Sequence, residues 1–456
     1  MHINEYEREI VDFLSDTKYE DLPPDAIEGT KRCILDNWGV IAAGVGGKDI
    51  EKLHQYLRSE PNRPEATVFG RTEKLSAFNA IWLNAAMARA REFDDSHDES
   101  GEHMGAPVMA AGLGTAQYLG GVSGKDFLRA YALASEFVPR VRECPVRDGM
   151  PFFGFGANSY APFSAAIMVA SLMGLKGRDM YHALGWAYAQ MAGAVQLQQG
   201  GSSCLHIHHG LAAATGFRAA RLAQEGFPGT PDFLLGRFGV LNAYERGNYN
   251  LEPLTRDLGK TYAVANVGVK MYPSGRVTHT PIDAALAIRN REGFELDKVK
   301  QIKVKYTKGG FAMTCLPDAD RHYPTNPQHA KFSLYYTVAC ALLRGHVNLT
   351  DFTEEAVNDP KIKAVIDKLV IDVDESIPML LPGIIDAEME DGSVIHEHVP
   401  YMHGSVHDPI SYDEIKGKVA TCLSFAGGCM SQYSADNIAA QIHNLENIAD
   451  VTSVLL

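Results

Sequence analysis

Apolar residues recur every three or four positions through most of the first 250 residues of the chain. This spacing predicts helices over residues 29–45, 75–90, 124–141, 161–175 and 211–226. The alternation that marks strands is scarce here. This half of the chain therefore predicts a bundle of packed helices, and we expect its methionine and aromatic side chains in the core.

The pattern changes near residue 265. Apolar and lysine side chains alternate over residues 299–308, which predicts a half-buried strand. One face carries Ile302, Val304 and Tyr306, and the other carries Lys303 and Lys305. Residues 368–375 and 392–401 predict further strands.

Two helices are predicted beside these strands. Residues 278–293 begin with Thr280 as the expected N-cap and Pro281 at the first helical position. Residues 329–345 form a second helix that ends at Gly345. After residue 408 the pattern is helical again.

These patterns together predict a mainly α protein, with a large all-helical domain and an inserted α+β lid domain. We expect the helical domain at residues 1–265 and the lid domain at residues 266–405. Residues 406–456 are expected to form C-terminal helices that return to the helical domain.

Charge and composition narrow the class of partner. The chain has 456 residues and a formal net charge of −14, which argues against nucleic acid and anionic membranes as partners. No run of about 18 apolar residues occurs, so no membrane span is expected. The seven cysteines form no C-x-x-C pair, and the N-terminus does not resemble a signal peptide. We therefore expect a cytoplasmic location.

The sequence REFDDSHDESGEH, residues 91–103, interrupts the apolar pattern and is called the acidic segment below. Its spacing fits no EF-hand and no H-E-x-x-H motif, so no metal is assigned to it. On a helix Glu92 and Ser96 would share a face, Asp94 would point elsewhere, and His103 would lie in a turn. A helix end with capping acids and an acid/base site are the open alternatives.

Two further segments carry candidate chemistry. Residues 200–210 place His206 and His208 just before a helix, where a zinc site, a pocket wall and helix capping are the alternatives. Residues 269–285 gather basic and hydroxyl groups around a Pro-Ser-Gly turn, as a carboxylate-binding cleft or a solvated loop would. Those groups are Lys270, Tyr272, Arg276 and His279.

The chain has no nucleotide fingerprint and no nucleophile elbow in a matching context. The natural class is acid/base chemistry without a cofactor. Such chemistry needs a positioned base, a proton donor, and cations that hold carboxylates and stabilise an enolate-like anion.

Taken together, these segments resemble the MmgE/PrpD family, which includes dehydratases, decarboxylases and epimerases. The sequence EFDDSH is similar to the family's D-F-D-D-T-H run, and KMYPSGRVTHTPIDAA is similar to its K-x-Y-P-x-C-R-x-x-H-x-x-I-D-A block. HAKFSLYYTVACAL and CLHIHHGLAAATGFRAARLAQEGFPG resemble two more of its segments. The resemblance covers nearly the whole chain in the correct order.

The resemblance implies an all-helical domain with an α+β lid, a homodimer, an active site between the domains, and no metal or organic cofactor. It also implies a small di- or tricarboxylate, or a related compound, as the substrate, and proton transfer at a carbon next to a carboxylate. By position, it makes His103 the proton carrier, Lys270 and Arg276 the carboxylate ligands, and Glu92 with Ser96 the orienting pair. We add Asp94 to the catalytic group, and Tyr272, His279 and His206 to the residues expected to bind substrate.

Four positions depart from the family pattern. Its H-P-T histidine falls on Phe155 and its lysine before P-L-H falls on Ser203, so these two are also expected to line the substrate site. Its leading aspartate is Glu92 and the block's cysteine is Gly275. The loss of a cation and of an acid/base group favours a substrate with fewer carboxylates or an apolar arm. The leading hypothesis is a dehydratase-type lyase. An isomerase or epimerase, a decarboxylase and a catalytically impaired ligand-binding protein are the alternatives.

Overall fold

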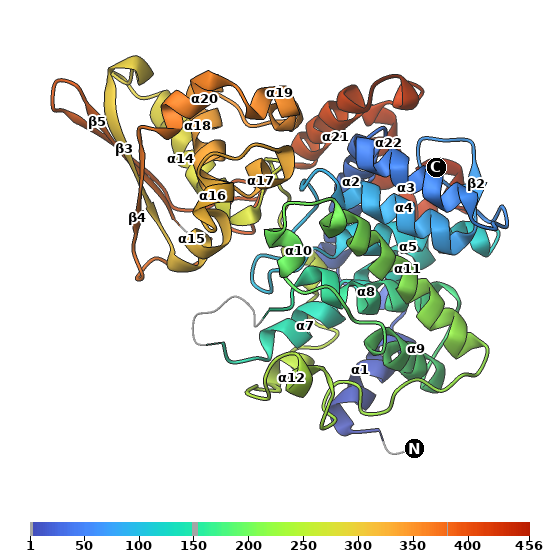
Figure 1. Cartoon of the computed structure of the whole chain (residues 1–456). Helices are drawn as coiled ribbons and strands as arrows, with labels where there is room; N and C mark the ends of the chain where they lie inside the picture. Colours follow the sequence, from blue (N-terminus) through green and yellow to red (C-terminus); the bar gives the residue numbers. More distant parts are fainter. Residues whose placement is uncertain (1–2, 148–153, 381) are drawn as a thin grey trace.

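The computed structural model describes residues 3–147, 154–380 and 382–456, and it has a mainly α fold, as predicted (Figure 1). The helical domain contains α1 (Glu5–Asp16), α2 (Pro24–Gly44), α3 (Lys48–Ser59), α4 (Ala77–Arg89), α5 (Gly105–Tyr118), α6 (Gly124–Ala134), α7 (Phe137–Glu143), α8 (Ala157–Leu172), α9 (Arg178–Tyr188) and α11 (Cys204–Gln224). Its only strands among the described residues are β1 (Ala66–Thr67) and β2 (Lys74–Leu75).

Small residues set the distance between the central helices. Helix α11 packs against α8 and α4. A Cβ on Gly210 would lie 2.3 Å from the carbonyl oxygen of Trp82, and one on Gly216 would lie 2.5 Å from the Cβ of Ala165. Only glycine fits at these two crossings, and the surrounding alanines keep the helices close along their length.

The lid contains a four-stranded sheet with helices on one face. Its strands are β3 (Val299–Tyr306), β4 (Leu369–Val373), β5 (Gly383–Met389) and β6 (Val394–Val399), in the order β4-β3-β5-β6. β3 pairs parallel with β4 and antiparallel with β5, with Val304 opposite both Ile371 and Ile385. The lid helices include α14 (His279–Arg289), α15 (Lys308–Thr314), α17 (Pro327–Lys331), α18 (Leu334–Arg344) and α20 (Pro360–Ile366). The alternation read from β3 is confirmed, because Ile302, Val304 and Tyr306 are buried.

The buried apolar side chains form two main clusters. One runs from Ile10 to Val269 and resumes from Ile410 to Leu455, and the other runs from Ile282 to Met389. Helices α21 (Tyr412–Ala426) and α22 (Ala435–His443) therefore add to the first core, and Figure 1 shows α21 beside α2. The sheet lies on the far side of the lid from this core. The domain limits themselves stay a prediction.

Several local predictions need correction. The helix expected at 124–141 is divided into α6 and α7. The first residue of α14 is His279, so Thr280 is not its N-cap; its hydroxyl instead donates to the carbonyl of Leu380 at 2.6 Å. Strand β5 was not predicted, because its apolar residues alternate with the acidic residues Asp386 and Glu388 and it begins at a Pro-Gly pair, which is more typical of a loop. No helix of the described residues is long and apolar enough to cross a membrane.

Candidate active site

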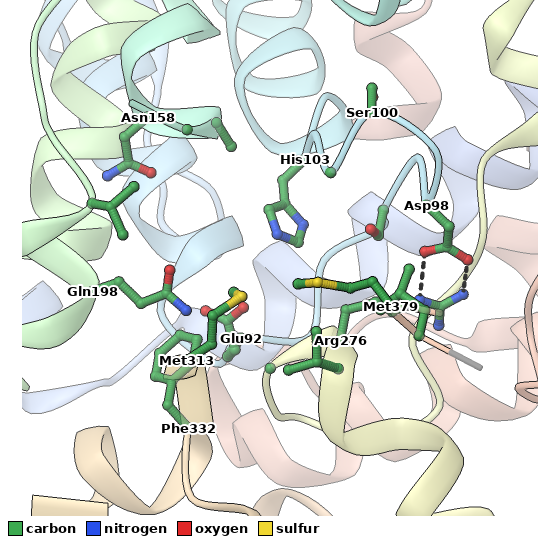
Figure 2. A pocket seen from close by; sticks show the side chains of 18 of the residues that line it. Glu92, Asp98, Ser100, His103, Asn158, Gln198, Arg276, Met313, Phe332 and Met379 are labelled. Atoms are coloured by element: carbon green, nitrogen blue, oxygen red, sulfur yellow. Dashed lines mark hydrogen bonds and ion pairs between the residues drawn. The ribbon is translucent and has the colours of Figure 1, made fainter. Parts of the chain in front are cut away.

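A cavity of about 610 Å³ lies between the helical domain and the lid (Figure 2). One side, called the polar wall, comes from the end of α4 and the acidic segment: Arg89, Glu92, Ser96, Asp98, Ser100 and His103. The opposite side, called the lid wall, is apolar: Val277, Met313, Phe332, Met379 and Leu380. In Figure 2 the ring of His103 points toward Met313, Met379 and Phe332.

The acidic segment is a folded loop and not the helix end considered from the sequence. Helix α4 ends at Arg89, and Glu92 adopts a left-handed backbone conformation with φ 54°, which is costly for a residue with a side chain. Ser96 forms a bridge with Gly268, and His97 forms one with Glu102. Glu92 and Ser96 therefore do not share a helix face, although both line the cavity.

The start of α5 fixes the end of this loop. The carboxylate of Asp95 accepts hydrogen bonds from the backbone N–H of Gly105 at 3.0 Å and from the amide of Asn37 at 2.9 Å. A Cβ on Gly105 would lie 2.0 Å from Asn37 Nδ2 and 2.2 Å from Asp95 Oδ2. Because residue 105 is glycine, the carboxylate of Asp95 can reach the start of α5. This contact places the backbone carbonyl of Asp95 beside His103.

His103 has a defined tautomer and no charge at neutral pH. Its Nδ1–H donates to the carbonyl oxygen of Asp95 at 2.7 Å, so Nε2 carries the free lone pair. Burial lowers the pKa of His103 to about 4, and the positive charges of Arg89 and Lys270 act in the same direction. The result is a buried, neutral imidazole on the cavity wall that can accept a proton.

An ionic cluster lies beneath His103. Glu92 contacts Lys270 Nζ at 2.7 Å and Arg89 Nη1 at 2.8 Å, and Asp94 contacts the same Nη1 at 2.7 Å. Burial alone would raise the pKa of Glu92, but Arg89 and Lys270 outweigh it and lower that pKa to about 2. They also lower the pKa of Asp94. Both carboxylates are ionised at neutral pH.

Lys270 and Arg276, the two expected carboxylate ligands, are both occupied by groups of this chain. Lys270 is fully buried behind Glu92 and does not line the cavity. Arg276 lines it, and Asp98 accepts two hydrogen bonds of 2.7 Å from its Nε and Nη2, drawn as dashed lines in Figure 2. Nη1 of Arg276 also donates to the carbonyl of Val269, and Nη2 to the carbonyl of Gly404, both at 3.3 Å. The role of Lys270 and Arg276 as substrate ligands stays a prediction.

Six further expected residues lie outside the cavity lining: Asp94 of the catalytic group, and Tyr272, His279, Ser203, His206 and Phe155 of the substrate-binding group. The hydroxyl of Tyr272 donates to Asp283 at 2.6 Å, and its ring packs against that of His279. Phe155 packs edge-on against Tyr244, with ring centroids 4.7 Å apart. Three residues that follow Phe155, Gly156 to Asn158, do line the cavity.

The zinc hypothesis for His206 and His208 does not hold in this fold. It required an extended backbone, but both residues lie in the first turns of α11, where positions two apart point to different faces. Among the described residues, only His97, Glu99 and Glu143 have potential ligand atoms within 4.8 Å of one another. Glu143 already pairs with Arg256 at 2.8 Å, and His97 Nδ1 contacts the hydroxyl of Ser100 at 2.9 Å, so we assign no metal there.

Sequence reasoning missed several groups at this site. Asn158 lines the cavity and links α8 to α11, because its carbonyl oxygen contacts His209 Nδ1 at 3.0 Å and its amide donates to the carbonyl of Leu205 at 3.0 Å. Gln198, Asp98 and Arg89 also line the cavity. Asp98 was visible within the acidic segment, but no motif marked Arg89, Asn158 or Gln198.

Comparisons with known proteins agree with this architecture. The model of the MmgE/PrpD N-terminal domain matches residues 8–252, and that of the MmgE/PrpD C-terminal domain matches residues 272–446. A cis-aconitate decarboxylase of Aspergillus terreus is 25% identical over 98% of this chain and 94% of its own length. One of Mus musculus is 24% identical over 95% and 89%. A 2-methylcitrate dehydratase of Cupriavidus necator is 21% identical over 85% and 83%.

Proposed function

This chain belongs to the MmgE/PrpD family, and on that premise we propose that it is a lyase that moves a proton next to a carboxylate, with His103 as the base. Its relatives named above are dehydratases and decarboxylases, which supports an enzyme of that general type. The substrate we propose is a small hydroxy- or unsaturated carboxylate, and the reaction is the elimination of water.

The observation that carries the proposal is the state of His103. An imidazole with a pKa of about 4 is unprotonated at pH 7, so it is ready to accept a proton and is a poor donor. A reaction that begins with proton abstraction therefore fits this site better than decarboxylation, in which the carbanion left by the departing carbon dioxide must receive a proton from a donor.

The proposed step balances without a second base. Nε2 of His103 takes the proton from the carbon next to the carboxylate, and the electrons of that C–H bond form the new double bond. The hydroxyl on the neighbouring carbon leaves and takes the proton back from His103 as water. Ser96, Ser100 and Asn158 line the cavity within the same region and supply hydrogen bonds to the substrate oxygens.

The substitution His103→Gln tests this assignment. We expect kcat/KM to fall by about 10²- to 10⁴-fold, the usual contribution of a positioned base, with the melting temperature little changed. His398→Gln is the matched control, because His398 is exposed on β6 in the lid. Equal activity of the wild type and His103→Gln would refute the role of His103.

Solvent deuterium separates the alternatives. A dehydratase gives a conjugated acid of lower mass and new ultraviolet absorbance. An isomerase or epimerase incorporates deuterium from the solvent without any loss of mass. Binding without either signal would identify a catalytically impaired ligand-binding protein, and release of carbon dioxide would identify a decarboxylase.

A further inference from the structure

We propose that the substrate carries one carboxylate and an apolar arm, with the carboxylate on Arg89 and the arm against the lid wall. This inference deepens the proposed function, on which it rests, by naming the substrate class. It excludes the di- and tricarboxylates that the family resemblance implied.

The first argument is the charge balance of the cavity. Among the described residues, Arg89 and Arg276 are the lysine or arginine residues that line it, and three carboxylates line it with them: Glu92, Asp98 and Glu99. The segments outside the described residues, 1–2, 148–153 and 381, contain no lysine or arginine in the sequence. A second or third substrate carboxylate would therefore meet negative charge without a free cation to neutralise it.

The neighbouring lysines do not change this balance. Lys270 is held by Glu92, as described above. Lys331 is buried and donates to the carbonyl of Ala90 at 2.7 Å and to Gln328 at 3.0 Å, and it does not line the cavity. Burial lowers the pKa of Lys331 to about 7, with Arg91 acting in the same direction, so it is only partly charged near neutral pH.

The second argument is the hydrogen-bonding capacity that Arg89 keeps. Its contacts with Glu92 and Asp94 both go through Nη1. Its Nε–H is buried with no hydrogen-bond partner in the part of the chain that the structure describes. Because that Nε–H is closed off, a substrate carboxylate would reach Arg89 through Nη2, which makes no hydrogen bond among the described residues. Arg276, by contrast, uses Nε, Nη1 and Nη2 on groups of this chain, and its Nε and Nη2 are both held by Asp98.

The third argument is the lid wall. Five apolar side chains line this side of the cavity, and two of them, Met313 and Met379, which Figure 2 shows, are flexible thioethers that adapt to an alkyl chain. A tricarboxylate offers nothing to this wall and would desolvate its carboxylates against it. An alkyl arm gains from the same burial, by about fourfold in affinity per methylene.

Calorimetry with the purified full chain tests the substrate class. The probes are butyrate, hexanoate and octanoate in their 3-hydroxy forms, with citrate and cis-aconitate as the tricarboxylates. We expect affinity to increase about fourfold with each added methylene and the tricarboxylates to bind more weakly than 3-hydroxyhexanoate. Tighter binding of either tricarboxylate than of every hydroxy acid would overturn the proposal, as would affinity independent of chain length.

Two substitutions address the two walls separately. Met379→Gln should reduce the gain in affinity per methylene and leave the affinity for 3-hydroxybutyrate nearly unchanged. Met173→Gln, at a half-buried methionine outside the cavity, should change neither.

Asp98→Asn removes the charge that neutralises Arg276, so it should raise the affinity for citrate at least tenfold. Its control is Glu397→Gln, which removes the partner of Arg291 on the lid and should leave citrate binding unchanged.

The binding and catalytic results can fail independently. If the hydroxy acids bind best but exchange no proton with the solvent, the substrate class stands and the proposed lyase reaction fails. If His103→Gln abolishes turnover but citrate binds most tightly to the wild type, the reaction stands and the substrate class fails. Failure of Asp98→Asn to improve citrate binding, with the protein folded, would remove the charge argument.

Discussion

The two walls of the cavity are built on different principles. The polar wall gathers charged groups whose positions depend on one another: Arg89 at the end of α4 pairs with Glu92 on the strained loop and with Asp94 behind it. The lid wall is made of five apolar side chains from four places in the lid, and no ion pair links them. The first wall fixes protonation states and the second fixes shape. Substitutions should therefore have large, coupled effects on the polar wall and small, separable effects on the lid wall.

The largest expected effect is the loss of the buried pair beneath the polar wall. Lys270→Met leaves Glu92 and Asp94 with Arg89 as their one close cation, a net buried negative charge, and should lower the free energy of unfolding by about 3–5 kcal/mol. Denaturant titration measures this. Lys308→Met removes a pair with Glu375 of the same 2.7 Å length that is exposed on both sides, and should cause no measurable change. Equal losses in the two variants would contradict the coupled view of the polar wall.

A second test enlarges one residue beside the polar wall. Gly105→Ala places a methyl group against Asn37 and Asp95, and such overpacking should destabilise the protein by about 1–3 kcal/mol. Because Asp95 also orients His103, activity should fall with stability. Gly417→Ala in α21 is the control: its added Cβ meets nothing within 4 Å, so it should be neutral or slightly stabilising. Normal activity in Gly105→Ala would show that the position of Asp95 does not determine the orientation of His103.

The pH profile sharpens the comparison further. Since the base must be unprotonated, and burial lowers the pKa of His103 to about 4, kcat/KM should show no inflection at the ordinary histidine pKa of about 6.5. It should decline below about pH 4, approaching tenfold, or about 1.4 kcal/mol, per pH unit. Short assays at acid pH, followed by return to pH 7 to show that the enzyme is intact, measure this. An inflection near 6.5 that is absent from His103→Gln would show that the ring is solvated.

The smallest expected effect belongs to the lid wall. Thr280→Val removes the hydrogen bond to the carbonyl of Leu380 and should cost about 0.5–1.5 kcal/mol. The affinity for a long alkyl arm should fall slightly, and the pH profile should not move. Thr421→Val is the control, since its hydroxyl donates to the carbonyl of Gly417, one turn earlier, at an exposed position of α21. A shifted pH profile in Thr280→Val would mean that the two walls are coupled after all.

Local patterns predicted the parts of this fold that depend on local interactions. The helical repeat located α2, α4, α8 and α11, and the alternation located β3 with its buried face. The same reasoning missed β5, whose acidic outer positions resemble a loop, and misplaced the N-cap of α14, because the hydroxyl of Thr280 bonds to a residue a hundred positions away. A capping rule uses only neighbours in sequence, so it cannot predict a hydrogen bond to a residue that is distant along the chain.

The candidate site shows the same division. The sequence by itself singled out the acidic segment and residues 269–285 as candidate site segments, and His103, Glu92, Ser96 and Arg276 do line the cavity. Only the tertiary structure decided which charges are free. Arg276 and Lys270 are paired with acids 178 positions away, and Arg89 keeps an unpaired N–H. Electrostatic energy depends on the distance between charges in space and on their burial, and neither quantity can be derived from the order of residues along the chain.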